Sequence, residues 1–143
     1  MDVIRTATPS DAEALFHLNR AFNGEGLADA GRIRRSLAEN DREIVCVAER
    51  GGQVVAFCCG QVTESMCYPE KSGEITELYV RPDARRCGIA SALVRFTEQR
   101  CIERGAAELR LLTGRTNHAA RALYESLGYS IDGEVHYVKS APK

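Results

Sequence analysis

Residues 78–90 read Leu78-Tyr79-Val80-Arg81-Pro82-Asp83-Ala84-Arg85-Arg86-Cys87-Gly88-Ile89-Ala90, and this stretch decides the fold. An apolar strand ends here, a tight loop follows, and a helix is predicted to begin near Gly88. The first amides of a helix have no intrahelical acceptor and lie at the positive end of its dipole. Gly88 and Ala90 lack bulk, and Arg85 and Arg86 add positive charge. The loop is therefore suited to bind a diphosphate.

The segments on either side of this loop predict an α/β fold with a mixed sheet. Their order, β-α-α-β-β-β-α-β-α-β, combines an antiparallel meander with a β-α-β crossover. A chain of 143 residues that is 44% hydrophobic fits one core, so we expect a single domain over residues 1–143. The strands are expected at residues 3–7, 43–49, 53–62, 73–80, 107–113 and 129–139, and the helices at 9–24, 31–39, 88–104 and 117–127.

Composition argues against several classes of protein. The formal net charge is −1, which gives no field that would attract nucleic acid or an anionic membrane surface. The longest apolar stretch, residues 54–59, is too short to span a bilayer, and residues 1–5 do not begin a signal peptide. The phosphate motifs of P-loop and Rossmann proteins are also absent from the sequence. We therefore expect a cytoplasmic protein with no nucleic-acid or membrane partner.

No set of side chains is spaced to hold a metal ion. The sequence has no C-x-x-C pair, and its three histidines, His17, His118 and His136, are far apart. We expect reduced and mostly buried thiols, and no metal. The six cysteines are Cys46, Cys58, Cys59, Cys67, Cys87 and Cys101.

Two motifs together resemble the GNAT acetyltransferase family. The first is Glu74-Ile75-Thr76-Glu77-Leu78-Tyr79-Val80 followed by Arg85-x-x-Gly88-x-Ala90. The second is Asn117-x-x-Ala120-x-x-x-Tyr124-x-x-x-Gly128-Tyr129. The resemblance covers residues 73–129 in the right order and spacing. Ala90 departs from the commonest pattern, which has glycine there, but alanine is tolerated in the family.

The resemblance implies that acetyl-CoA is the co-substrate and that the fourth and fifth strands splay apart to admit its pantetheine arm. A backbone N–H near Leu78 would then serve as an oxyanion hole. Cys87 would be a loop residue, with a nucleophilic role as the alternative. The implied binding residues are Leu78, Tyr79 and Val80 on the strand, Arg85, Arg86, Cys87, Gly88, Ile89 and Ala90 in the loop, and Asn117, Ala120 and Tyr124 on the later helix.

Acyl transfer to an amine needs a base for the ammonium proton and an acid for the departing thiolate. The resemblance assigns the acid to Tyr124, whose hydroxyl keeps its proton at neutral pH. Glu74 and Glu77 are the candidate bases. Their odd separation places them on opposite faces of a regular strand, a rule that a bulge would relax. Deprotonation through water, with neither glutamate, is the alternative.

The acceptor is expected to be a small-molecule or peptide amine that attacks acetyl-CoA directly in a ternary complex. Two other readings remain: a non-catalytic acyl-CoA-binding or sensor module of the same fold, and an acyltransferase that uses another acyl-CoA. A homodimer is compatible with either reading. The acceptor site is expected to be framed by Asn23 and Glu25, by residues 65–68, and by His136 and Tyr137.

Overall fold

A five-stranded mixed sheet organises the first part of the molecule. The computed structural model describes residues 2–143, which fall into two units, residues 2–112 and 113–143. Neighbouring strands follow chain order; the first four are antiparallel, and the fifth is parallel to the fourth. The mixed α/β sheet is as predicted. Its strands are β1 (Asp2–Thr6), β2 (Glu43–Arg50), β3 (Gln53–Thr63), β4 (Lys71–Val80) and β5 (Ala106–Leu111).

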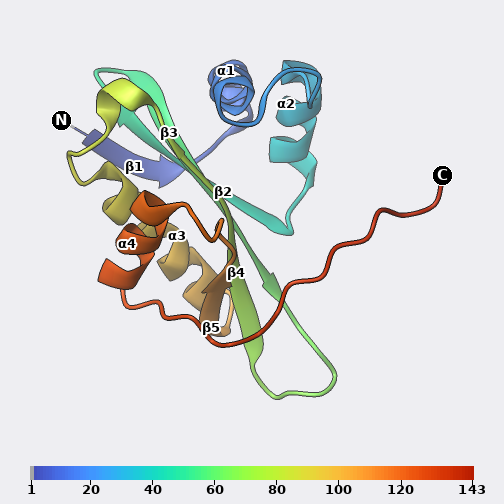
Figure 1. Cartoon of the computed structure of the whole chain (residues 1–143). Helices are drawn as coiled ribbons and strands as arrows, with labels where there is room; N and C mark the ends of the chain where they lie inside the picture. Colours follow the sequence, from blue (N-terminus) through green and yellow to red (C-terminus); the bar gives the residue numbers. More distant parts are fainter. Residues whose placement is uncertain (1) are drawn as a thin grey trace. The chain divides into compact units, whose positions relative to one another are not determined.

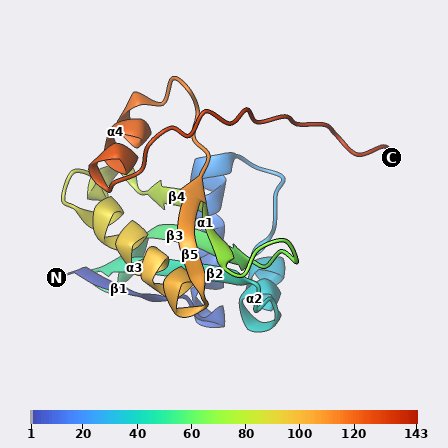
Figure 2. The same ribbon diagram turned by 90° about the horizontal axis from the view of Figure 1, so that it is seen from below.

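Helices cover both faces of this sheet. Helices α1 (Ala12–Asn23) and α2 (Ala30–Glu39) lie on one face, and α3 (Ile89–Glu103) lies on the other (Figures 1 and 2). A 3₁₀ turn, Pro9–Asp11, precedes α1 because Pro9 fixes its first turn. Among residues 2–143, every helix is too short or too polar to cross a bilayer.

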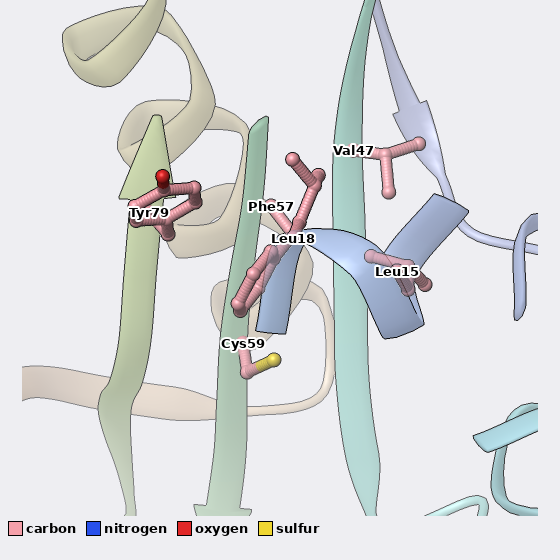
Figure 3. Packing of buried hydrophobic residues seen from close by; sticks show 6 residues of the cluster. All are labelled: Leu15, Leu18, Val47, Phe57, Cys59 and Tyr79. Atoms are coloured by element: carbon pink, nitrogen blue, oxygen red, sulfur yellow. The ribbon is translucent and has the colours of Figure 1, made fainter. Parts of the chain in front are cut away.

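The face under α1 and α2 has an apolar core. Leu15 and Leu18 of α1 pack against side chains from β2, β3 and β4 (Figure 3). Phe22 adds aromatic contacts, with its ring centroid 5.1 Å from that of Tyr79. The sheet residues of this cluster are Val47, Phe57, Cys59 and Tyr79, and Ile33 and Leu37 of α2 pack beside them.

An ion-pair network fixes the entry to α1. Arg5 donates to both carboxylate oxygens of Asp11 at 2.8 Å and to Glu49 at 3.2 Å. The Arg5 guanidinium beside Asp11 holds the pKa of that carboxyl below its usual value, and Asp11 is 6% exposed. A buried carboxylate needs such a partner, so the network ties β1, β2 and the start of α1 together.

The opposite face accommodates α3 because two strand positions are glycine. A Cβ added at Gly73 would lie 3.3 Å from Cys101 Cβ of α3 and 2.8 Å from Leu109 Cδ1 of β5, and one added at Gly60 would lie 3.1 Å from Thr97 Cγ2 of α3. Helix α3 therefore packs directly on the backbone. Three buried thiols, Cys46, Cys58 and Cys101, fill this layer, and burial raises the pKa of Cys58 to about 12.

The second unit contains one helix, α4 (His118–Ser126), and an extended C-terminal segment. The Asn117 side chain caps α4 by accepting a hydrogen bond from the Ala120 N–H at 3.1 Å. The strand predicted at residues 129–139 is wrong: the structure has no strand among residues 113–143. The turn itself forms, with the Glu134 N–H donating to Asp132 Oδ1, but an isolated hairpin of two strands is only marginally stable in water.

We predict that Gly73→Ala lowers the free energy of unfolding by about 1–3 kcal/mol, because the new methyl group meets Leu109, Ala106 and Cys101 closer than packing allows. Denaturation in urea, followed by circular dichroism, measures the change. Gly31→Ala is the matched control, since its Cβ would meet only Asp29 Oδ1, at 3.5 Å, within α2. That variant should be neutral or slightly more stable. Equal losses in the two variants would contradict the packing argument.

Candidate active site

The loop between β4 and α3 has the backbone of an anion site. Arg86 and Gly88 adopt positive φ angles, 64° and 81°, and α3 begins immediately afterwards at Ile89. The first hydrogen bond of the helix runs from the Ala92 N–H to the Gly88 carbonyl, at 3.1 Å. The amides at the start of α3, before Ala92, therefore have no acceptor within the helix. A Cβ built at Gly88 meets nothing within 4 Å. There is thus open space beside Gly88, at the positive end of α3.

Arg85 is held back against strand β4. Its Nε donates to the Val80 carbonyl at 2.8 Å, and its guanidinium carbon lies 5.7 Å from the centre of the Tyr79 ring. The sequence predicts two arginines that add charge beside an anion. In the structure Arg85 anchors the loop to the strand, while Arg86 is exposed.

Cys87 also contributes to the shape of the loop. Its thiol donates to the carbonyls of Ala84 and Arg85 at 3.1 and 3.2 Å. Both acceptors lie within three residues, so these contacts close the turn before α3. They favour the loop role over the nucleophilic one.

Strands β4 and β5 separate partway along β4. Their pairing ends at Ile75 and Leu111, whereas β4 continues to Val80. The splayed strands expected from the resemblance are therefore present. The Arg81 N–H bonds to the Val55 carbonyl of β3, and alternation directs the backbone groups of Leu78 and Val80 away from β3. Because Arg85 occupies the Val80 carbonyl, the groups left at this open edge are the N–H and carbonyl of Leu78 and the N–H of Val80.

A β-bulge brings the two candidate bases to one face of the sheet. Glu77 pairs with Cys59, but Ile75 pairs with Gly60, so Thr76 is an extra residue in β4. Glu74 pairs with Gln61, two residues from Cys59. Both glutamates consequently lie on the face covered by α1 and α2, whereas a regular strand would have separated them.

Burial perturbs the carboxylates on this face. It raises the pKa of Glu77 above its usual value. The pKa of Glu43, on β2, is also raised, first by burial and then by repulsion from Glu77, although a hydrogen bond with the Cys59 thiol opposes the rise. Sequence reasoning missed Glu43, which resembles any acid at the start of a strand. One sign of its position can be read from the sequence. Glu43, Val45 and Val47 follow one another at intervals of two residues, so their side chains lie on the same face of the strand.

The second unit holds the remaining predicted residues. Tyr124 is 9% exposed, and its ring meets that of Tyr129 edge to face, with centroids 5.9 Å apart. Asn117 uses Oδ1 to cap α4, which leaves its amide donors for another partner. Asn117, Ala120 and Tyr124 share one helix in this unit, and the contact of that helix with an acyl-CoA remains a prediction.

One of the predicted acceptor elements borders a cavity. Glu25 lines a space of about 280 Å³ between α1 and the loop that follows it, together with Phe16, Asn19, Arg20 and residues 24–28. Met66 and Tyr68, in the loop between β3 and β4, are exposed. Among the described residues, no group of histidine, cysteine or acidic side chains is placed to hold a metal ion.

Comparison with known proteins identifies the class. A model of the Acetyltransferase (GNAT) family matches residues 12–129. An uncharacterized N-acetyltransferase, YhfO of Bacillus subtilis, is 32% identical over 145 residues, covering 97% of each chain. N-acetyltransferase family 8 member 2 of Rattus norvegicus is 34% identical over 81% of this chain, which spans 50% of that protein. The chain belongs to the GNAT acetyltransferase family.

Solved structures show the same fold. A soil-metagenome aminoglycoside acetyltransferase, meta-AAC0020, aligns with a TM-score of 0.85 at 20% identity, covering 99% of this chain and 97% of the other. A ribosomal-protein-alanine N-acetyltransferase of Brucella melitensis aligns with a TM-score of 0.82 at 21% identity, covering 99% and 100%.

Proposed function

We propose that the protein is an N-acetyltransferase that transfers an acetyl group from acetyl-CoA to a primary amine in a ternary complex. The observation that carries the proposal is the open-edged β4, which leads through the glycine loop into the free amides of α3. Residues 1–143 would act as one domain, since the family match runs from residue 12 to residue 129 across both units.

The loop residues Arg85, Arg86, Cys87, Gly88, Ile89 and Ala90 would bind the diphosphate of acetyl-CoA. Backbone amides at a helix start suit this anion, and the exposed Arg86 adds charge. Leu78, with Tyr79 and Val80, would line the acyl arm. The Leu78 N–H would stabilise the oxyanion that develops as the amine attacks. Acetyl-CoA itself supplies the acyl group as an activated thioester.

The reaction moves two protons. An alkyl ammonium must lose one before its nitrogen can attack, and Glu77 is our first candidate to accept it, because burial raises its pKa and it lies near the open edge of β4. Glu74 is the second, on the same face. As the C–N bond forms and the C–S bond breaks, Tyr124 would give its proton to the sulfur. Tyr124 could then recover a proton from solvent.

The acceptor would be a small-molecule or protein amine, because the structural neighbours include aminoglycoside and ribosomal-protein acetyltransferases. We place the protein in the cytoplasm. The cavity bordered by Glu25 is the proposed entrance for a cationic acceptor.

Two measurements made together test the proposed function. Calorimetry with EDTA present should show acetyl-CoA binding, and a CoA-release assay over a library of amines should show turnover. Binding that required a divalent ion would contradict the amide-and-arginine cradle. Binding without turnover on any amine would favour the acyl-CoA sensor.

We predict that Gly88→Glu weakens acetyl-CoA binding by roughly a hundredfold or more, because a carboxylate would occupy the diphosphate site and repel its charge. Gly52→Glu is the matched control: its φ of 80° nearly equals the 81° of Gly88, and a Cβ there also meets nothing within 4 Å. Both variants bear the same backbone strain, so calorimetry should separate them. If Gly88→Glu bound like Gly52→Glu, the diphosphate site would lie elsewhere.

We also predict that Tyr124→Phe lowers kcat at least tenfold and leaves the Kd for acetyl-CoA nearly unchanged, since a positioned proton donor is worth about 10²–10⁴ in rate. The ring and its contact with Tyr129 are retained in this variant. Tyr129→Phe is the control and should turn over normally. Wild-type turnover by Tyr124→Phe, with chemistry rate-limiting, would remove Tyr124 from the mechanism.

A further inference from the structure

Two acidic side chains flank one thiol on the face covered by α1 and α2. In the register of the sheet, Glu77 of β4 lies directly beside Cys59 of β3, and Val45 of β2 lies on the other side. Glu43 precedes Val45 by two residues and therefore points to the same face. Neighbouring strands are about 4.8 Å apart and residues two positions apart along a strand about 6.7 Å, so the backbones of Glu43 and Glu77 are roughly 12 Å apart. Cys59 lies between them, and the Glu43 side chain reaches it with a hydrogen bond to the thiol.

Glu77 acts on Glu43 in a setting that contains few neutralising groups. Burial, and after it the charge of Glu77, raises the pKa of Glu43. Burial also raises the pKa of Cys59, and the charges of both carboxylates add to that rise. Glu74 lies on the same face, level with Glu43 across Gln61. The helices packed against this face contribute apolar side chains, namely Leu15, Leu18, Ile33 and Leu37.

The two arginines that line a cavity beside Glu43 have other partners. Glu43 borders a cavity of about 420 Å³ whose other charged lining residues are Asp41, Arg100, Glu103 and Arg104. Arg100 pairs with Glu103 at 2.6 Å, and Arg104 donates to the Asp41 carbonyl at 2.9 Å. Within residues 2–143, neither arginine forms an ion pair with Glu43.

We infer that Glu43 and Glu77 form a two-carboxylate proton acceptor, in which Glu43 acts on the reaction through Glu77. The inference rests on the proposed function and names a residue outside the motifs that define the family in this chain. Glu43 is half-buried and Glu77 is exposed. Two like charges in a shared site cannot both ionise as readily as one. The pair therefore keeps its last proton to a higher pH than a single glutamate would, which makes the doubly ionised pair a stronger base.

The proton balance is simple. The doubly ionised pair takes one proton from the acceptor ammonium, directly or through water, and becomes singly charged while the amine becomes neutral. After the acetylated product leaves, the pair releases that proton to water. Because the two groups are coupled, the two titration steps belong to the pair and not to either residue alone.

The test compares the wild type with Glu43→Gln, Glu77→Gln and a control, Glu39→Gln, which removes an exposed carboxylate at the end of α2. Carbon-13 NMR of glutamate side-chain carboxyls is recorded against pH without acetyl-CoA or amine. We expect the higher of the two steps of the pair to fall by roughly one pH unit in either single variant and to stay in Glu39→Gln. This step falls because each substitution removes the repulsion between the two carboxylates, which makes the pair retain its last proton.

The acid side of the kcat/KM profile for the amine provides the second readout. Its midpoint should fall by about the same one pH unit in Glu43→Gln, with the Kd for acetyl-CoA within roughly twofold of the wild type. A reduction in rate with no movement of the midpoint would mean a structural role and overturn the inference. Identical carboxyl titrations in the wild type and the single variants would overturn it as well.

The failure of this inference can be told apart from failure of the proposed function. If Glu43→Gln did not fold, the Glu77→Gln titration would still decide whether the carboxylates are coupled. If the wild type acetylated no amine, the proposed function would fall and the catalytic use of the pair would fall with it. If the wild type were active but its two carboxylates titrated independently, the inference would be overturned and the proposed function would stand.

Discussion

Strand β4 is bonded to β3 along nearly its whole length but to β5 only as far as Ile75, and the other features of the site depend on this change. Before that point β4 is an ordinary central strand, held under α3 by the close contact at Gly73. Beyond it, one edge of the strand has no β partner among the described residues, and the Leu78 backbone is directed to that edge. The loop then carries the chain directly into the first amides of α3.

The bulge at Thr76 occurs almost where β5 departs. One extra residue reverses which side chains face which helices, so Ile75 faces α3 while Glu77 faces α1 and α2. The sheet thereby separates two environments. A compact apolar and thiol-rich layer supports α3, and the other face sets carboxylates beside the aromatic core around Tyr79.

Local signals sufficed for the order of the elements as far as α4, the mixed sheet and the helix start at Gly88, because glycine, proline and apolar periodicity act within a few residues. The sequence carries no comparable signal for the extra residue at Thr76, since a bulge depends on how β4 fits between its neighbours. The effect of Glu77 on Glu43 could not be read from the sequence for the same reason: the two lie 34 positions apart and come near each other only through the register of the sheet. The strand expected after Tyr129 failed because alternation alone does not supply a partner strand.

The placement of the cysteines has a chemical consequence for the purified protein. Cys46, Cys58, Cys59 and Cys101 are buried, and burial disfavours the thiolate that reacts with oxidants, whereas Cys67 and Cys87 are exposed. Oxidation during storage should therefore begin at the two exposed positions. At Cys87 it would add bulk to the loop before α3, so a preparation would lose the proposed diphosphate site while its secondary structure and melting behaviour stayed intact.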